Sequence, residues 1–136
     1  MQGLHLTADL HGCRCAMDWL TEAGPLGDFC LQAVQAVGLQ AVSQVVHTFP
    51  STDQGPGGVT ATVLLAESHL CVHTWPEQRA VTLDVYVCNM GGDHSAKARA
   101  LLAALLQRFD ATQVEQHALQ RGQLRSPPQA PADLRA

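Results

Sequence analysis

Residues 66–77 carry an unusual density of side chains that can do chemistry. The segment reads AESHLCVHTWPE and includes an acid, a hydroxyl, two imidazoles and a thiol, namely Glu67, Ser68, His69, Cys71 and His73. Burying such groups without partners would cost on the order of a few kcal/mol. The combination therefore indicates a functional site rather than packing alone.

One interpretation of this segment is a metal site. In a regular strand alternate side chains share a face, so His69, Cys71 and His73 would project together and Ser68 would lie on the other face. Cys88, from a following strand, could supply a fourth ligand, and zinc accepts such a tetrahedral set.

A second interpretation is nucleophilic chemistry at Ser68, with His69 or His73 as the base that activates the hydroxyl. The signature G-x-S-x-G is absent, which argues against an ordinary serine hydrolase. A third interpretation is that both histidines are simply hydrogen-bonded residues of the core.

Apolar patterning predicts the elements that position this segment. Strands are expected at residues 4–10, 41–49, 59–66, 70–75, 80–88 and 112–119, and helices at 25–37 and 95–109. The order is β-α-β-β-β-β-α-β, and the short turns between the central strands imply antiparallel pairing. Two helices on one face of such a sheet give a two-layer α+β sandwich. The uncovered face must be solvated or covered, and the apolar strand at 59–66 favours a homodimer.

Composition narrows the classes of function. The chain has 136 residues, 46% of them hydrophobic, which suits one domain with its own core. Only eight Lys and Arg residues and a net charge of -4 argue against a nucleic-acid partner. No apolar run is long enough to span a bilayer, and the N-terminus has no signal-peptide pattern, so we expect a cytoplasmic protein.

The cysteines and the C-terminal region complete this outline. An odd number of cysteines favours free thiols in a reducing compartment, and the five are Cys13, Cys15, Cys30, Cys71 and Cys88. Residues 123–136 are rich in proline and poor in large apolar side chains, so we expect a flexible tail after a single domain at 1–122.

The spacing of the reactive segment resembles that of a known family. ESHL at 67–70 followed by HTWPE at 73–77 is similar to the self-processing motif of the prokaryotic-type S-adenosylmethionine decarboxylases. Further segments that resemble the family are HL-x-ADL-x-GC at 5–13, GVT at 58–60, LDVYVC at 83–88 and RG at 121–122. The likeness covers about residues 3–122.

The resemblance implies a proenzyme that cleaves its own backbone between Glu67 and Ser68, giving fragments 1–67 and 68–136. In that scheme the Ser68 hydroxyl attacks the Glu67 carbonyl to form an ester, and loss of the Ser68 α-proton leads through dehydroalanine to a pyruvoyl cofactor. By position, His73 is the acid–base group of processing and Thr60 assists it. The resemblance also implies that Cys88 returns a proton to the substrate after carbon dioxide leaves.

The implied substrate is S-adenosylmethionine, a small molecule whose decarboxylated form feeds polyamine (spermidine) synthesis. By position, Phe49 stacks on adenine, Glu77 holds the ribose hydroxyls and Glu67 lines the site. One constraint is geometric, because Ser68 and His73 are five residues apart and an ideal strand puts them on opposite faces. Either the backbone bends near Ser68, or His73 meets the α-hydrogen rather than the hydroxyl.

Three features depart from the family pattern. Thr60 stands where the family has serine, and its extra methyl group restricts χ1. The loop at 50–58 is longer than usual, and Gln78-Arg79 replaces an aromatic–glycine pair. Relatives of the family act on arginine or ornithine, so these amino acids are alternative substrates. A non-catalytic metal-binding relative is the alternative from another class.

Overall fold

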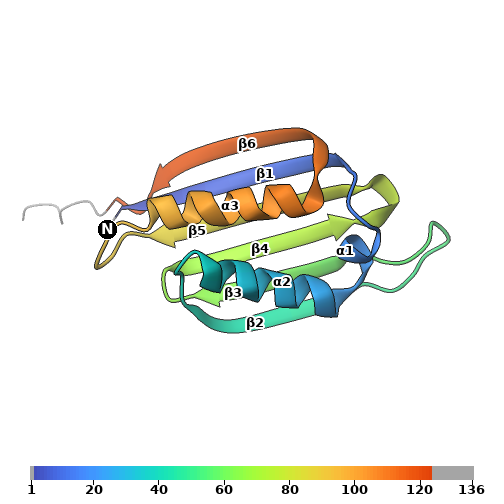
Figure 1. Cartoon of the computed structure of the whole chain (residues 1–136), viewed down its shortest axis with the longest axis horizontal. Coiled ribbons are helices and arrows are strands. Elements are labelled where there is room, and N and C mark those ends of the chain that lie inside the picture. The colour runs from blue at the N-terminus through green and yellow to red at the C-terminus, as the bar shows by residue number, and fades with distance from the viewer. Residues whose placement is uncertain (1, 124–136) are drawn as a thin grey trace, which may run out of the picture.

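A single antiparallel sheet of six strands forms the frame, and helices cover one of its faces (Figure 1). The computed structural model describes residues 2–123. The strands are β1 (Gly3–Cys13), β2 (Ala41–Thr48), β3 (Val59–Leu65), β4 (Ser68–Trp75), β5 (Ala80–Cys88) and β6 (Ala111–Arg121). The helices are α1 (Asp18–Thr21), α2 (Ala23–Ala36) and α3 (Ser95–Phe109), and a 3-10 turn, η1 (Pro76–Gln78), joins β4 to β5. The predicted two-layer α+β sandwich is confirmed.

The central strands alternate between a buried face under the helices and an open face. In β4 the buried residues are Leu70, Val72 and Thr74, whereas His69, Cys71 and His73 lie on the open face. The helices complete the core with Leu26, Cys30 and Val34 from α2 and with Ala98, Leu101, Leu102, Leu105 and Phe109 from α3. The predicted division of the reactive segment between two faces is therefore confirmed from His69 onward.

The order of the strands places distant residues at one end of the sheet. The order is β2-β3-β4-β5-β1-β6, with β1 inserted between β5 and β6. Because neighbouring strands are antiparallel, Ser68 at the start of β4 pairs with Val87, and Gly3 at the start of β1 pairs with Cys88. Ser68 and Cys88 therefore share one end of the sheet, and the loop at 50–58 lies at the other.

Most predicted boundaries differ from the observed ones by a few residues. β4 begins at Ser68 rather than at residue 70, and β6 runs from Ala111 to Arg121. The predicted tail at 123–136 lies, after Gln123, outside the described residues. Within residues 2–123, no helix has the length and apolarity needed to cross a bilayer.

All five cysteines are free thiols, as predicted, and they divide by burial. Burial raises the pKa of Cys30, on the inner face of α2, to about 12. Burial and the neighbouring Cys15 raise the pKa of Cys13 to about 11. Cys15, Cys71 and Cys88 are partly exposed. Cys13 and Cys30 therefore belong to the core rather than to a reactive site.

We expect Cys13 and Cys30 to resist alkylation in the folded protein. The thiolate is the reactive form, and a pKa of about 11 or 12 keeps both thiols protonated at about pH 8. Iodoacetamide at about pH 8, followed by peptide mass spectrometry, should label Cys88 well before either of them. All five should label at comparable rates in guanidinium chloride. Rapid labelling of Cys30 in the folded chain would contradict its placement.

Candidate active site

The turn between β3 and β4 holds the backbone in a strained conformation at Ser68. Ala66 and Glu67 form a two-residue loop that is closed by the pairing of Leu65 with Ser68. The φ angle of Ser68 is 151°, in a region that glycine adopts freely but a residue with a Cβ does not. Such strain costs on the order of 1–3 kcal/mol and clusters at functional sites. The backbone therefore departs from regular strand geometry at Ser68, as the first of the two possibilities from sequence required, and it does so next to the peptide bond predicted to be cleaved.

Hydrogen bonds hold Glu67 on the other side of the same peptide bond. The Cys88 N–H donates to the Glu67 carbonyl oxygen across 2.7 Å, and the Gln40 N–H donates to the Glu67 carboxylate across 2.9 Å. A donor already aimed at a carbonyl oxygen can stabilise the negative charge that develops when the carbonyl carbon is attacked. Sequence reasoning missed Gln40, because its backbone makes the contact and leaves no side-chain signature.

A cleft of about 610 Å³, called here the Ser68 cleft, opens over this junction. It brings together three of the predicted site residues, Glu67, Ser68 and Cys88. The lining residues that sequence reasoning missed are Gln40, Ala66, Tyr86, Met90 and His94. The ring of Tyr86 lies over Gly3, where an added Cβ would come within 2.8 Å of it. The single tyrosine of the chain could have been suspected from its place two residues before Cys88 on the same face of β5.

A second cleft, of about 360 Å³ and called here the Phe49 cleft, lies at the opposite end of the sheet. It brings together Phe49, Thr60, His73 and Glu77. The Thr60 Oγ1 and His73 Nδ1 atoms are hydrogen-bonded at 2.9 Å, so the threonine keeps a hydroxyl contact with the histidine. The long loop supplies one wall through Pro50, Thr52, Gln54, Pro56, Gly57 and Gly58.

The two clefts are separate within one chain. They share no lining residue. Ser68 and His73 lie five residues apart on β4, a span of about 17 Å at a rise of about 3.3 Å per residue. A hydrogen bond spans only about 3 Å, so His73 reaches neither the hydroxyl nor the α-hydrogen of its own Ser68. Sequence reasoning did not foresee this separation.

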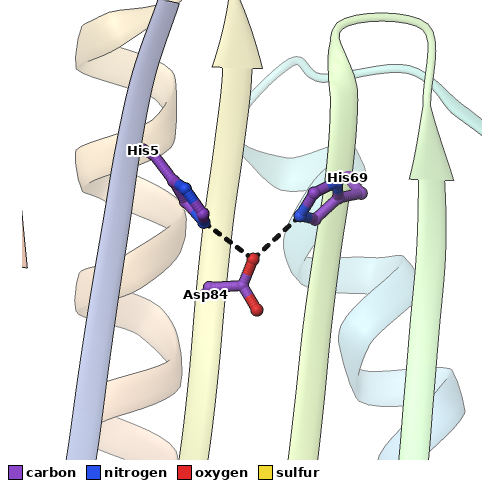
Figure 2. Close-up of side chains that lie close together, drawn as sticks. All are labelled: His5, His69 and Asp84. Atoms are coloured by element: carbon purple, nitrogen blue, oxygen red, sulfur yellow. Dashed lines mark hydrogen bonds and ion pairs between the residues drawn. The ribbon is translucent and has the colours of Figure 1, made fainter. Parts of the chain in front are cut away.

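A hydrogen-bonded network of side chains crosses the open face of the sheet. Figure 2 shows His5 from β1 and His69 from β4 converging on one carboxylate oxygen of Asp84 from β5. The Nε2–Oδ2 distances are 3.0 Å for His5 and 2.8 Å for His69. Arg121 Nη1 donates to His5 Nδ1 across 3.0 Å, so His5 carries its proton on Nε2 and donates it to Asp84.

This network is the only group of three potential metal ligands that residues 2–123 bring within reach of one ion. A metal-bound imidazole normally donates from its other ring nitrogen to a carbonyl or carboxylate, whereas the Nδ1 atom of His5 faces the guanidinium of Arg121. The contacts are those of a hydrogen-bond network rather than of a metal centre.

The alternative metal set proposed from sequence is not assembled. It comprised His69, Cys71, His73 and Cys88. His69 is bonded to Asp84 and His73 to Thr60, and the Cys71 sulfur accepts a hydrogen bond from Thr62 Oγ1 at 3.5 Å. The four side chains cannot bind one metal ion merely because they share a face of the sheet, since they are spread along the length of β4 and β5.

Known proteins match almost the whole chain. The sequence model of the S-adenosylmethionine decarboxylase family matches residues 4–122. A protein of Hydrogenobaculum sp. named S-adenosylmethionine decarboxylase proenzyme is 33% identical over 120 residues, which are 88% of this chain and 81% of that protein. A protein of the same name from Parasynechococcus marenigrum is 35% identical over 133 residues, or 98% and 92% of the two chains.

A solved structure agrees in fold as well. The crystal structure of the adenosylmethionine decarboxylase from Aquifex aeolicus matches with a TM-score of 0.77 and 30% identity, covering 92% of this chain and 94% of that one. The chain therefore belongs to the S-adenosylmethionine decarboxylase family.

Proposed function

We propose that this chain is a self-processing decarboxylase that converts its own Ser68 into a pyruvoyl group and acts on S-adenosylmethionine. The observation that carries the proposal is the strained Glu67–Ser68 junction, whose carbonyl oxygen already receives a hydrogen bond from the Cys88 N–H. Membership of the family supports the same assignment. The products are carbon dioxide and decarboxylated S-adenosylmethionine, which supplies aminopropyl groups for polyamines such as spermidine.

Self-cleavage begins when Ser68 Oγ attacks the carbonyl carbon of Glu67. A C–O bond forms, the peptide C–N bond breaks, the hydroxyl proton ends on the released Ser68 nitrogen, and an ester replaces the amide. Negative charge passes through the Glu67 oxygen, where the Cys88 N–H is already placed to donate. The strained φ torsion of Ser68 includes the bond that breaks, so this step also releases the strain.

The ester is then removed by elimination rather than by hydrolysis. A base takes the α-proton of Ser68, Glu67 leaves as a carboxylate, and dehydroalanine remains at the new N-terminus. Water replaces its nitrogen, ammonia leaves, and the residue ends as a pyruvoyl group. His73, hydrogen-bonded to Thr60, is our candidate for the base, since histidine exchanges protons readily near neutral pH.

The pyruvoyl carbonyl supplies an electron sink for the loss of carbon dioxide from an amino-acid substrate. Cys88 lines the Ser68 cleft and is our candidate for the donor that protonates the carbon left behind. Glu67 becomes the C-terminus of the first fragment, and its contact with Gln40 keeps it at the wall of the cleft.

The Phe49 cleft favours a nucleoside substrate over a free amino acid. An aromatic ring that is half exposed can stack on a purine, and Phe49 is 49% exposed. Glu77, in the same cleft, offers a carboxylate to ribose hydroxyls. Arginine and ornithine have neither a base nor a ribose, so this cleft supports S-adenosylmethionine as the substrate.

We also propose that the active unit is a homodimer in which each active site uses both chains. The helix-free face carries exposed apolar side chains, including Val45, Leu64 and Leu119. A two-fold axis that lies between two such facing sheets and runs across their strands would lay the Phe49 end of one sheet over the Ser68 end of the other. His73 of the partner subunit then reaches the Ser68 that lies about 17 Å from the His73 of its own chain.

Self-cleavage is the first expected outcome. The purified chain should separate under denaturing conditions into fragments 1–67 and 68–136, the second with a pyruvoyl group in place of Ser68. Ser68→Ala removes the attacking oxygen, so this variant should remain one intact chain, close in mass to the 14.5 kDa of the uncleaved natural sequence. Denaturing mass spectrometry of both proteins over time measures this. An uncleaved natural chain after prolonged incubation would overturn the proposal.

Mixing two inactive variants tests the shared site. Ser68→Ala and His73→Ala should each fail to cleave alone. In mixed dimers the His73→Ala chain has an intact Ser68 and faces the intact His73 of the Ser68→Ala chain, so the His73→Ala chain alone should be cleaved. Mass spectrometry distinguishes the chains when one carries a tag.

The matched control pairs His73→Ala with the double variant Ser68→Ala/His73→Ala, which offers no histidine to its partner. That pair should stay intact. Cleavage of His73→Ala by itself, or no cleavage in the first mixture, would show that the site does not combine two chains in this way.

A further inference from the structure

The strain at Ser68 must be held by contacts on both sides of the residue. On the N-terminal side, Glu67 is tied to Cys88 and Gln40 by backbone donors. On the C-terminal side, the next residue is His69, whose imidazole bonds to Asp84 at 2.8 Å. A strained torsion persists only where its surroundings over-determine it. The bond from His69 to Asp84 is therefore our candidate for the restraint that holds Ser68 from its C-terminal side.

The geometry of the network suits it to act along the strand. Across the sheet, His69 pairs with Tyr86 and not with Asp84, whose direct partner on β4 is Cys71. His69 therefore reaches diagonally, away from the Ser68 end of the sheet. His5 also pairs with Tyr86 and also reaches diagonally to Asp84 (Figure 2). Both imidazoles thus anchor to one carboxylate set back from the turn.

The network is also anchored at its far end. Arg121 on β6 bonds to the other ring nitrogen of His5, and its guanidinium lies 4.7 Å from the centre of the Tyr86 ring. Four neighbouring strands are linked in this way, and Tyr86 itself lines the Ser68 cleft. The side chains of Asp84 and His69 are 26% and 32% exposed, so water competes only partly for these bonds.

We propose that Asp84 is a positioning residue for self-cleavage. It acts through His69 and, together with His5 and Arg121, holds the start of β4 so that the Glu67–Ser68 peptide remains in its strained conformation. Asp84 does not touch the reacting atoms. This inference rests on the proposed function, because it concerns how that function is prepared.

The first test compares rates of self-cleavage. Asp84→Ala removes both histidine contacts and should slow cleavage by roughly tenfold or more, while Asp84→Asn keeps one acceptor oxygen and should slow it less. Asp9→Asn is the matched control. Asp9 lies on β1, on the same open face of the sheet as His5 and Asp84, and it makes no side-chain hydrogen bond within residues 2–123. Equal rates in all four proteins would overturn the inference.

The second test separates positioning from a general loss of stability, and it needs no cleavage. Ser68→Ala keeps the strained torsion in an uncleavable chain, whereas Ser68→Gly removes the strain. If Asp84 enforces the strain, Asp84→Ala should lower the unfolding midpoint less in the Ser68→Ala chain than in the Ser68→Gly chain, because only the former gains by relaxing. Equal drops in the two backgrounds would mean that Asp84 does not act on Ser68.

The two tests fail in different ways. If the natural chain did not cleave, the proposed function would fall, while the comparison of the two uncleavable chains would still decide whether Asp84 strains Ser68. If the natural chain cleaved and both tests gave no difference, the function would stand and Asp84 would have no role in positioning.

Discussion

The proposed chemistry depends on one strained torsion at the turn between β3 and β4, which the rest of the structure holds in place. Ser68, with a φ of 151°, begins a strand directly after a two-residue loop. A serine left to itself would relax, because its Cβ disfavours that conformation. Ser68 cannot relax because β4 is paired in a fixed register with β3 and β5 and because Glu67 is held by a backbone hydrogen bond. The strain is stored at the peptide bond that the proposed chemistry breaks.

The buried face of the sheet makes this strain sustainable. Leu70 and Val72, immediately after the turn, are fully buried against the layer of helices, so β4 cannot slip in register without exposing them. The open face is thereby left free for polar side chains that work together. The same alternation that packs the core thus presents His69 and His73 to the open side.

The separation of the two clefts is the physical argument for the proposed dimer. An extended strand spreads its side chains over its whole length, so one strand cannot bring residues at its two ends into contact. Chemistry that needs Ser68 and His73 together must therefore come from a second sheet. The proposed dimer meets that need with the face that the helices leave uncovered, and the network of His5, His69 and Asp84 on that face would then lie between the two sheets.

Local pattern was enough to predict much of this molecule. Alternating and helical periodicity located every main element, and the antiparallel sheet with helices on one face followed from short connections and apolar faces. The motif at 67–77, with Cys88, pointed to the family that was then found. Prediction worked here because side-chain direction in a strand and burial in a helix repeat within a few residues. The cytoplasmic location stays a prediction.

Other features could not be read from the chain, because they depend on which distant residues the fold brings together. The strain at Ser68 arises from the register of three strands, and the contacts from Gln40 and Cys88 are made by backbone N–H groups, which every residue except proline carries. The metal site predicted from alternating side-chain directions was wrong, because residues on one face of a strand can still lie far apart along it. The sequence by itself determined the elements, their apolar faces and the reactive motif. Only the tertiary structure decided that His5 meets Asp84 and that Ser68 and His73 lie apart, because strand order and register are properties of the whole sheet.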